Sequence, residues 1–220
     1  MNDYRNVVVN KPWGYEYLMY QNDSMALWCL FLKSEAQTSL HCHPKKKTGL
    51  ILLQGDARVS FLNDWIDLKP LAKLMIREGL FHSTRSESPD GTVLIEAETP
   101  CDKENLVRLS DEYGRREMPY EGKDSMMPIP EDLLRLDDPT ETERSYSLCG
   151  CSLSVERIGS ESRLEERPST DIVVILEGGL VSQEGEQVLG PADVVSFDTL
   201  SRLSQSFGAP RGTSILSIRK

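Results

Sequence analysis

Two of the chain's three histidines, His41 and His43, lie one residue apart and precede an apolar run that ends at Gly55. In a β-strand, residues i and i+2 point to the same face, so both imidazoles can enter the interior of a barrel while Cys42 faces away. Neutral imidazole is the commonest side-chain ligand for Zn²⁺ and Fe²⁺. The spacing therefore predicts two ligands of a metal site, which needs a third from elsewhere.

The remaining histidine, His82, is the candidate for that third ligand. It follows Gly79, where the chain can turn into another strand. If that strand pairs with or neighbours the strand of His41 and His43, three imidazole nitrogens converge. The competing interpretation is a set of polar surface residues. We expect the three histidines to bind one divalent metal ion, with Zn, Mn, Fe and Ni all left open.

Strands, rather than helices, are expected to position these ligands. Runs rich in Val, Ile, Leu and Phe alternate with Gly, Pro, Asn and Asp, which is typical of strands separated by turns. A helical pattern is weak and confined to residues 102–115 and 130–138. The sequence predicts an all-β fold, with strands within 24–33, 48–62, 71–77, 91–99, 146–158, 170–182, 192–197 and 213–220.

Both halves of the chain carry the same order of features. An apolar run begins at Thr48 and ends at Gly55, and a second begins at Thr170 and ends at Gly178. Each glycine is followed by a further strand pattern. A single duplication at this spacing favours two related domains over a solenoid, whose repeats are shorter.

Residues 119–145 separate the two halves and are rich in proline and charge. A central strand does not accept so many residues without an amide donor, so we expect a linker there. The expected organisation is a metal-binding domain at 1–118, the linker, and a degenerate domain at 146–220. No histidine follows the third one, and the repeat offset places Arg163 and Glu165 at the paired-histidine positions. We expect no metal in the second domain.

The amino-acid composition limits the kinds of binding partner that we expect. The formal net charge of −10 argues against nucleic acid and membrane surfaces, which are both polyanionic. The longest apolar runs are too short to span a bilayer, and the N-terminus lacks the basic-then-apolar pattern of a signal peptide. We therefore expect a cytoplasmic protein, with its five cysteines as reduced thiols.

Two motifs resemble those of the cupin superfamily. "HCHPKKKTGLILLQG" is similar to the first cupin motif, with its H-x-H and later glycine, and "EGLFH" is similar to the second. The resemblance implies a double-stranded β-helix, a jelly-roll barrel. With the duplication, it implies a bicupin of two such barrels.

A narrower resemblance covers residues 11–115. "KPWGYEYLM" and "ENLVRLSDEYGR" resemble the two ends of the cupin domain of type II mannose-6-phosphate isomerases. His43 and His82 fall on metal-binding histidines of that family, and His41 falls where glutamine is common. The family's metal-binding glutamate falls on Thr48, which has no carboxylate. An isomerase also needs a base, and the sequence does not identify one.

Four basic residues are candidates for binding an anionic substrate. Lys45 and Lys46 belong to a run that follows the ligand strand and so is expected at the barrel mouth, although such runs are usually solvated loops. Arg108 and Arg115 lie in the closing motif, and arginine binds phosphate bidentately. Their alternative role is ion pairing within that same segment.

The resemblance implies a metal-dependent isomerase or epimerase that acts on a sugar phosphate or nucleotide sugar in carbohydrate metabolism and polysaccharide biosynthesis. Two alternatives stay open: a non-catalytic carbohydrate-binding or regulatory cupin, and a three-histidine Fe(II) dioxygenase. The continuous apolar runs "IVVIL" and "SILSI" of the second domain suggest strands that are buried on both faces. A sister barrel or a second subunit is expected to cover them, and we expect a homodimer.

Overall fold

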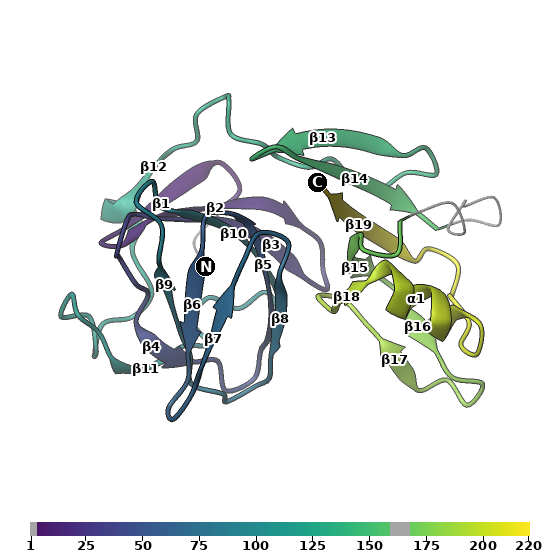
Figure 1. Cartoon of the computed structure of the whole chain (residues 1–220), viewed down its shortest axis with the longest axis horizontal. Coiled ribbons are helices and arrows are strands. Elements are labelled where there is room, and N and C mark those ends of the chain that lie inside the picture. The colour runs from purple at the N-terminus through teal and green to yellow at the C-terminus, as the bar shows by residue number, and fades with distance from the viewer. Residues whose placement is uncertain (1–3, 159–167) are drawn as a thin grey trace.

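The computed structural model describes residues 4–158 and 168–220, which fold as strands with little helix (Figure 1). The N-terminal unit comprises β1 (Val7–Lys11), β2 (Gly14–Gln21), β3 (Ala26–Leu32), β4 (Leu40–Cys42), β5 (Lys47–Gln54), β6 (Ala57–Ser60), β7 (Trp65–Leu68), β8 (Lys73–Ile76), β9 (Ser83–Ser86), β10 (Thr92–Thr99), β11 (Val107–Ser110), the 3₁₀ turn η1 (Lys123–Ser125) and β12 (Met126–Pro128). The C-terminal unit comprises β13 (Arg144–Leu148), β14 (Cys151–Arg157), β15 (Ile172–Glu177), β16 (Leu180–Val181), β17 (Gln187–Leu189), β18 (Val194–Ser196), α1 (Phe197–Ser204) and β19 (Ser214–Arg219). The all-β prediction is confirmed.

The N-terminal unit is built around a seven-stranded antiparallel sheet in the order β12-β1-β2-β3-β10-β5-β8. Two smaller sheets, β7-β6-β9 and β11-β4, complete this unit. Side chains alternate between the faces of the large sheet. Trp28, Leu50 and Leu94 enter the apolar interior of this unit, whereas Ile51 and Ile95 belong to a cluster on the opposite face.

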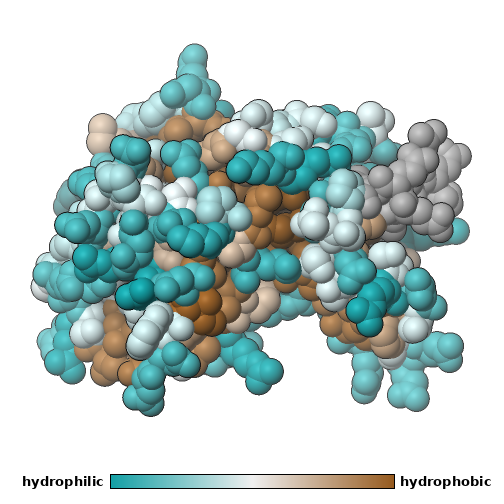
Figure 2. Space-filling view, in the orientation of Figure 1, coloured by the Kyte–Doolittle hydropathy of each residue, from teal (hydrophilic) through white to brown (hydrophobic). Residues whose placement is uncertain are grey.

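That opposite face packs against the C-terminal unit. Ile51 and Ile95 share one buried cluster with Val174, Leu216 and Ile218 from the second unit. Hydrophobic surface is visible along the junction of the two units in Figure 2. The large sheet is therefore covered on both faces. The apolar strands of the C-terminal unit are in turn covered on one face by the N-terminal unit.

The C-terminal unit has a five-stranded sheet in the order β13-β14-β19-β15-β18. The far side of this sheet buries Val173, Ile175 and Ile215 together with residues of the β16–β17 ribbon and of α1. The strands β15 and β19 are thus buried on both faces, as their continuous apolar runs predict. Gly55 and Gly178 occupy matching turns after β5 and β15, with φ of 79° and 68°.

Some expectations differ from the structure. Residues 102–115 contain the strand β11 rather than a helix, because this segment pairs with β4. Residues 130–138 are also non-helical, and the amide of Leu136 instead donates to the carbonyl of Met19 in β2. Conversely, α1 was not expected. It is an eight-residue helix capped by the Ser196 side chain, which accepts from the Thr199 amide.

The proline-rich segment 119–145 connects the two units and also adds a strand to the large sheet. Its strand β12 pairs with β1 at the edge of the large sheet, where Pro128 removes no internal hydrogen bond. Arg163 and Glu165, the residues at the repeat's paired-histidine positions, lie outside the described residues. No helix among the described residues is long and apolar enough to cross a membrane.

Candidate metal centre

The three histidines meet where β4 approaches the start of β9. His41 and His82 form an antiparallel bridge, with amide-to-carbonyl distances of 3.0 and 2.8 Å in the two directions. The ring centroid of His41 lies 4.5 Å from that of His82 and 5.0 Å from that of His43, and the latter two are 5.8 Å apart. One ring nitrogen from each lies within 4.8 Å of the others. Among the described residues, no other trio of His, Cys, Asp or Glu gathers in this way.

The Nδ1 atom of each imidazole is held by a backbone carbonyl. The distances are 2.7 Å from His41 to the oxygen of Ser39, 2.6 Å from His43 to that of Asn105, and 2.9 Å from His82 to that of Leu80. A carbonyl only accepts, so each Nδ1 carries the proton and each Nε2 keeps a free lone pair. A carbonyl behind each ring in this way fixes the tautomer of metal-binding histidines. The donor set therefore fits a divalent cation.

Burial also keeps the three imidazoles neutral. It lowers the pKa of His43 to about 3, and the nearby charge of Lys46 adds to this effect. Burial lowers the pKa of His41 well below its usual value, with further contributions from His82 and His43. The pKa of His82 is lowered by burial as well. At neutral pH the site therefore presents three uncharged ligands.

A cavity of about 60 Å³ adjoins two of these ligands, His41 and His43. It lies between the large sheet and the segment that carries β11, and its lining is mostly polar, with many charged side chains. The charged side chains that line it are Lys11, Glu16, Lys46, Glu96, Lys103, Arg108 and Arg115.

Three of the four basic candidates therefore line the cavity, and one does not. Lys46 is buried and its Nζ lies 2.8 Å from Oε2 of Glu98. Lys45 is exposed and does not line the cavity; its backbone amide donates to the side chain of Asn105. The adjacent lysines thus occupy different environments.

The two arginines are held within their own segment. Arg115 makes ion pairs of 2.7 Å with Asp111 and 2.6 Å with Glu121. Arg108 donates to the carbonyl oxygens of Met118 and Pro119, while its Nε is buried without a hydrogen-bond partner among the described residues. Both side chains line the cavity, so each is placed to meet an anion there.

The sequence did not point to three charged residues that line the cavity, Glu16, Glu96 and Lys103, or to Glu98, which is buried against Lys46. Burial raises the pKa of Glu96 to about 7, against the opposing charge of Lys103. Burial acts in the same direction on Glu16, but Lys103 and Lys11 outweigh it and hold its pKa at about 2. A signal was present in "TVLIEAET", where Glu96 and Glu98 share the parity of the inward-facing Leu94.

The position where the isomerase resemblance places a metal-binding glutamate holds an uncharged polar residue. Thr48 lies in β5 and is fully buried. Its hydroxyl has no hydrogen-bond partner within the part of the chain that the structure describes. The site accordingly offers three imidazoles and no carboxylate at this position.

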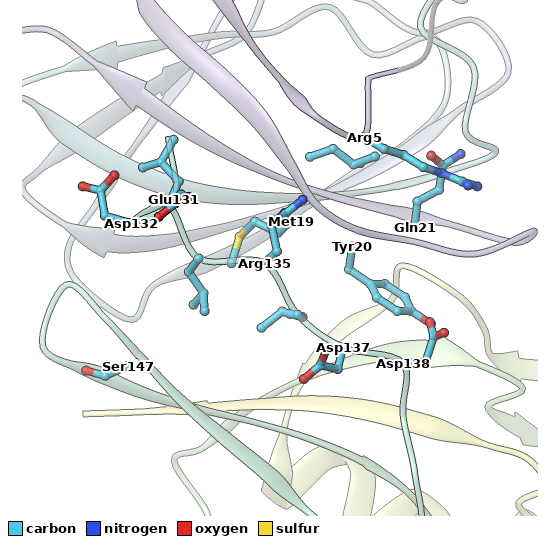
Figure 3. A pocket seen from close by; sticks show the side chains of 14 residues that line it. Arg5, Met19, Tyr20, Gln21, Glu131, Asp132, Arg135, Asp137, Asp138 and Ser147 are labelled. Carbon is cyan, nitrogen blue, oxygen red and sulfur yellow. The ribbon is translucent and has the colours of Figure 1, made fainter. Parts of the chain in front are cut away.

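A second cavity, of about 670 Å³, shares no lining residue with the cavity beside the histidines (Figure 3). Figure 3 shows Arg5 and Gln21 at one end, Glu131 and Asp132 at the other, and Asp138 beside the Tyr20 hydroxyl. The residues that form it come from β2, the 131–138 segment and β13, together with Arg5. It contains no histidine or cysteine, so the chemistry of the metal centre does not extend to it.

Comparisons with known proteins are limited to structure. No family model matches the sequence, and no curated protein matches it. KdgF from Halomonas sp. is similar at 16% identity and a TM-score of 0.40, over 42% of this chain and 84% of that one. A Klebsiella pneumoniae protein with a double-stranded β-helix domain has 11% identity and a TM-score of 0.40, over 44% and 79%. The Schizosaccharomyces pombe Cnp3 cupin domain has 12% identity and a TM-score of 0.37, over 47% and 69%. Likeness at this level says nothing of activity, metal or ligand.

Proposed function

We propose that this chain is a bicupin whose N-terminal barrel holds one divalent metal ion through Nε2 of His41, His43 and His82. One observation carries the proposal: each Nδ1 donates to a backbone carbonyl, which leaves three convergent lone pairs on neutral rings. The C-terminal unit, which has no histidine, is the degenerate partner and supports the large sheet.

The substrate that we propose is a small oxygen-rich anion, a sugar phosphate, which the protein isomerises in the manner of mannose-6-phosphate isomerases. Lys46, Lys103, Arg108 and Arg115 line the cavity beside the histidines and favour a dianion. The bound metal would supply Lewis acidity towards the substrate's carbonyl and hydroxyl oxygens. The chain's own basic residues would orient the phosphate.

The cavity beside the histidines is too small to hold a sugar phosphate as it stands. Its volume of about 60 Å³ is far below the roughly 300–1,000 Å³ of ordinary small-molecule sites. Lys103, Arg108, Arg115 and Tyr120 all reach it from one segment, residues 103–120. We propose that this segment moves outward to admit a sugar phosphate.

The same small volume favours a second candidate, an Fe(II) dioxygenase. Three neutral ligands without a carboxylate leave open positions for a small oxidant, and a small cavity suits a small substrate. Product formation that requires air and iron would favour this candidate. Turnover without air, with zinc or manganese, would favour the isomerase.

The test combines metal content with turnover. The full chain is purified without chelators, its metal content is measured, and mannose 6-phosphate is followed to its ketose isomer with and without air. We expect about one metal ion per chain. His43→Ala should lose most of the metal while keeping the β-sheet circular dichroism, and Lys45→Ala, an exposed neighbour, should keep both. Equal metal content in wild type and His43→Ala would contradict the site, and bound metal without turnover would contradict the isomerase.

A further inference from the structure

Glu96 lines the cavity that adjoins His41 and His43. It lies in the middle of β10, directly opposite Trp28 of β3 and Leu50 of β5. Its strand neighbours Ile95 and Ala97 face the junction with the C-terminal unit, so Glu96 points the other way, into the cavity. The same cavity is also lined by His41 and His43.

Glu96 also differs from every other acid around the cavity in having no bound partner. Glu16 accepts from the Tyr120 hydroxyl and pairs with Lys11 and Lys103. Glu98 accepts from Lys46 and from the indole of Trp28. No hydrogen bond or ion pair joins Glu96 to any residue that the structure describes. A carboxylate left unpaired inside a charged cavity is available to a ligand.

We propose that Glu96 is the catalytic base that carries the proton during isomerisation, an inference that rests on the proposed sugar-phosphate function. The bond between the second carbon and its hydrogen breaks, and the hydrogen leaves as a proton to the Glu96 carboxylate. The electron pair of that bond forms the carbon–carbon double bond of an enediolate, and the carbonyl pair moves to oxygen. Glu96 then returns the proton to the first carbon, while the remaining hydroxyl proton passes from the second carbon's oxygen to the first carbon's oxygen.

The surroundings suit a group that must both accept and donate. Lys46 and Lys103 face Glu96 as cations, and Glu16 and Glu98 face it as anions. Lys11 and Arg108 line the same cavity. Burial and the two acids outweigh the lysines and bring the pKa of Glu96 to about 7, so both protonation states are populated at neutral pH.

The first test follows proton exchange on the metal-loaded full chain. Mannose 6-phosphate is incubated in deuterium oxide, and loss of the proton on its second carbon is measured by NMR. Wild type should exchange it. Glu96→Gln should exchange it at least about 100-fold more slowly, with unchanged metal content and substrate binding. Glu96→Asp should recover part of the rate, and Glu177→Gln, an exposed glutamate of the C-terminal unit, should match wild type.

The outcomes separate the two ideas. Wild-type exchange that persists in Glu96→Gln would overturn the role of Glu96 and leave the isomerase intact. No exchange in wild type would overturn the isomerase and, with it, this role. A second readout needs no substrate: carbon-13 NMR of the glutamate carboxyls should show one group that titrates near pH 7 in the metal-loaded protein and is missing in Glu96→Gln. Its absence in wild type would also overturn the inference.

Discussion

Glu98 lies directly opposite Thr48 where β10 pairs with β5. Both side chains point into the N-terminal unit and both are fully buried. The Thr48 hydroxyl has no partner, whereas the Glu98 carboxylate accepts from Lys46 and Trp28. A buried carboxylate thus exists one strand away from the position where the isomerase resemblance places one, but a lysine holds it.

The unpartnered hydroxyl leads to a stability prediction. Thr48→Val should raise the free energy of unfolding by about 1 kcal/mol, because it replaces a buried, unsatisfied hydroxyl with a methyl group of similar size. Urea unfolding measures the change. The control is Thr213→Val, whose hydroxyl accepts from the Gly179 amide and donates to the Pro210 carbonyl, and which should be destabilised by a similar amount. Destabilisation of Thr48→Val would show that its hydroxyl is satisfied.

The adjacent lysines form a matched pair. Lys46→Met should lower the free energy of unfolding by about 3 kcal/mol, because Glu98 would lose the buried partner at 2.8 Å. Lys103, at 3.7 Å, would compensate in part. Lys45→Met should change it by less than about 0.5 kcal/mol, since that side chain is exposed. Equal effects in the two variants, measured by urea unfolding, would contradict the buried ion pair.

Metal affinity should resist acid. A histidine whose pKa is lowered stays deprotonated as pH falls through 6.5, so protons do not compete with the metal until the pH is lower still. We expect zinc affinity at pH 5.5 to be within about 3-fold of that at pH 7.5, whereas three ordinary imidazoles would lose roughly 10-fold each. Competition with a chelator at both pH values measures this. A fall of more than about 100-fold would mean that the rings are protonated as usual.

Removal of the C-terminal unit should expose the junction. A fragment of residues 1–129 keeps β12 and would leave the outer face of the large sheet, including Ile51 and Ile95, in contact with water. We expect this fragment to self-associate or precipitate, and size-exclusion chromatography beside the full chain measures it. A monomeric fragment with cooperative unfolding and full metal content would show that the second unit gives the first no support.

The strands could be predicted because their cores are local patterns. "TGLILLQG" and "TVLIEAET" became β5 and β10 almost as the sequence predicts, and strand parity placed His41 beside His43. The bridge between His41 and His82 agrees with the expectation that their strands are neighbours. The helix α1 was not predicted, because it spans only eight residues directly after a strand pattern.

The charged cavity could not be predicted, because its partners are distant in sequence. Lys46 and its partner Glu98 are 52 positions apart in the sequence, and Lys11 and its partner Glu121 are 110 positions apart. Such pairs depend on register, and a shift of one residue would turn Glu96 and Glu98 towards the other face of the sheet. For the same reason, Lys45 and Lys46 looked equivalent in sequence although only Lys46 enters the interior.

The strands beside the candidate metal site differ in how they are supported. β5 and β10 each have a hydrogen-bonded strand on both sides in the seven-stranded sheet, and apolar layers pack on both of its faces, so their amides should exchange with solvent only through global opening. His41 and His82 instead lie at the margin of a two-stranded and a three-stranded sheet. Such margins open locally at low free-energy cost. Removal of a bound metal ion would thus loosen the backbone around His41 and His82, while β10, which carries Glu96, keeps its shape.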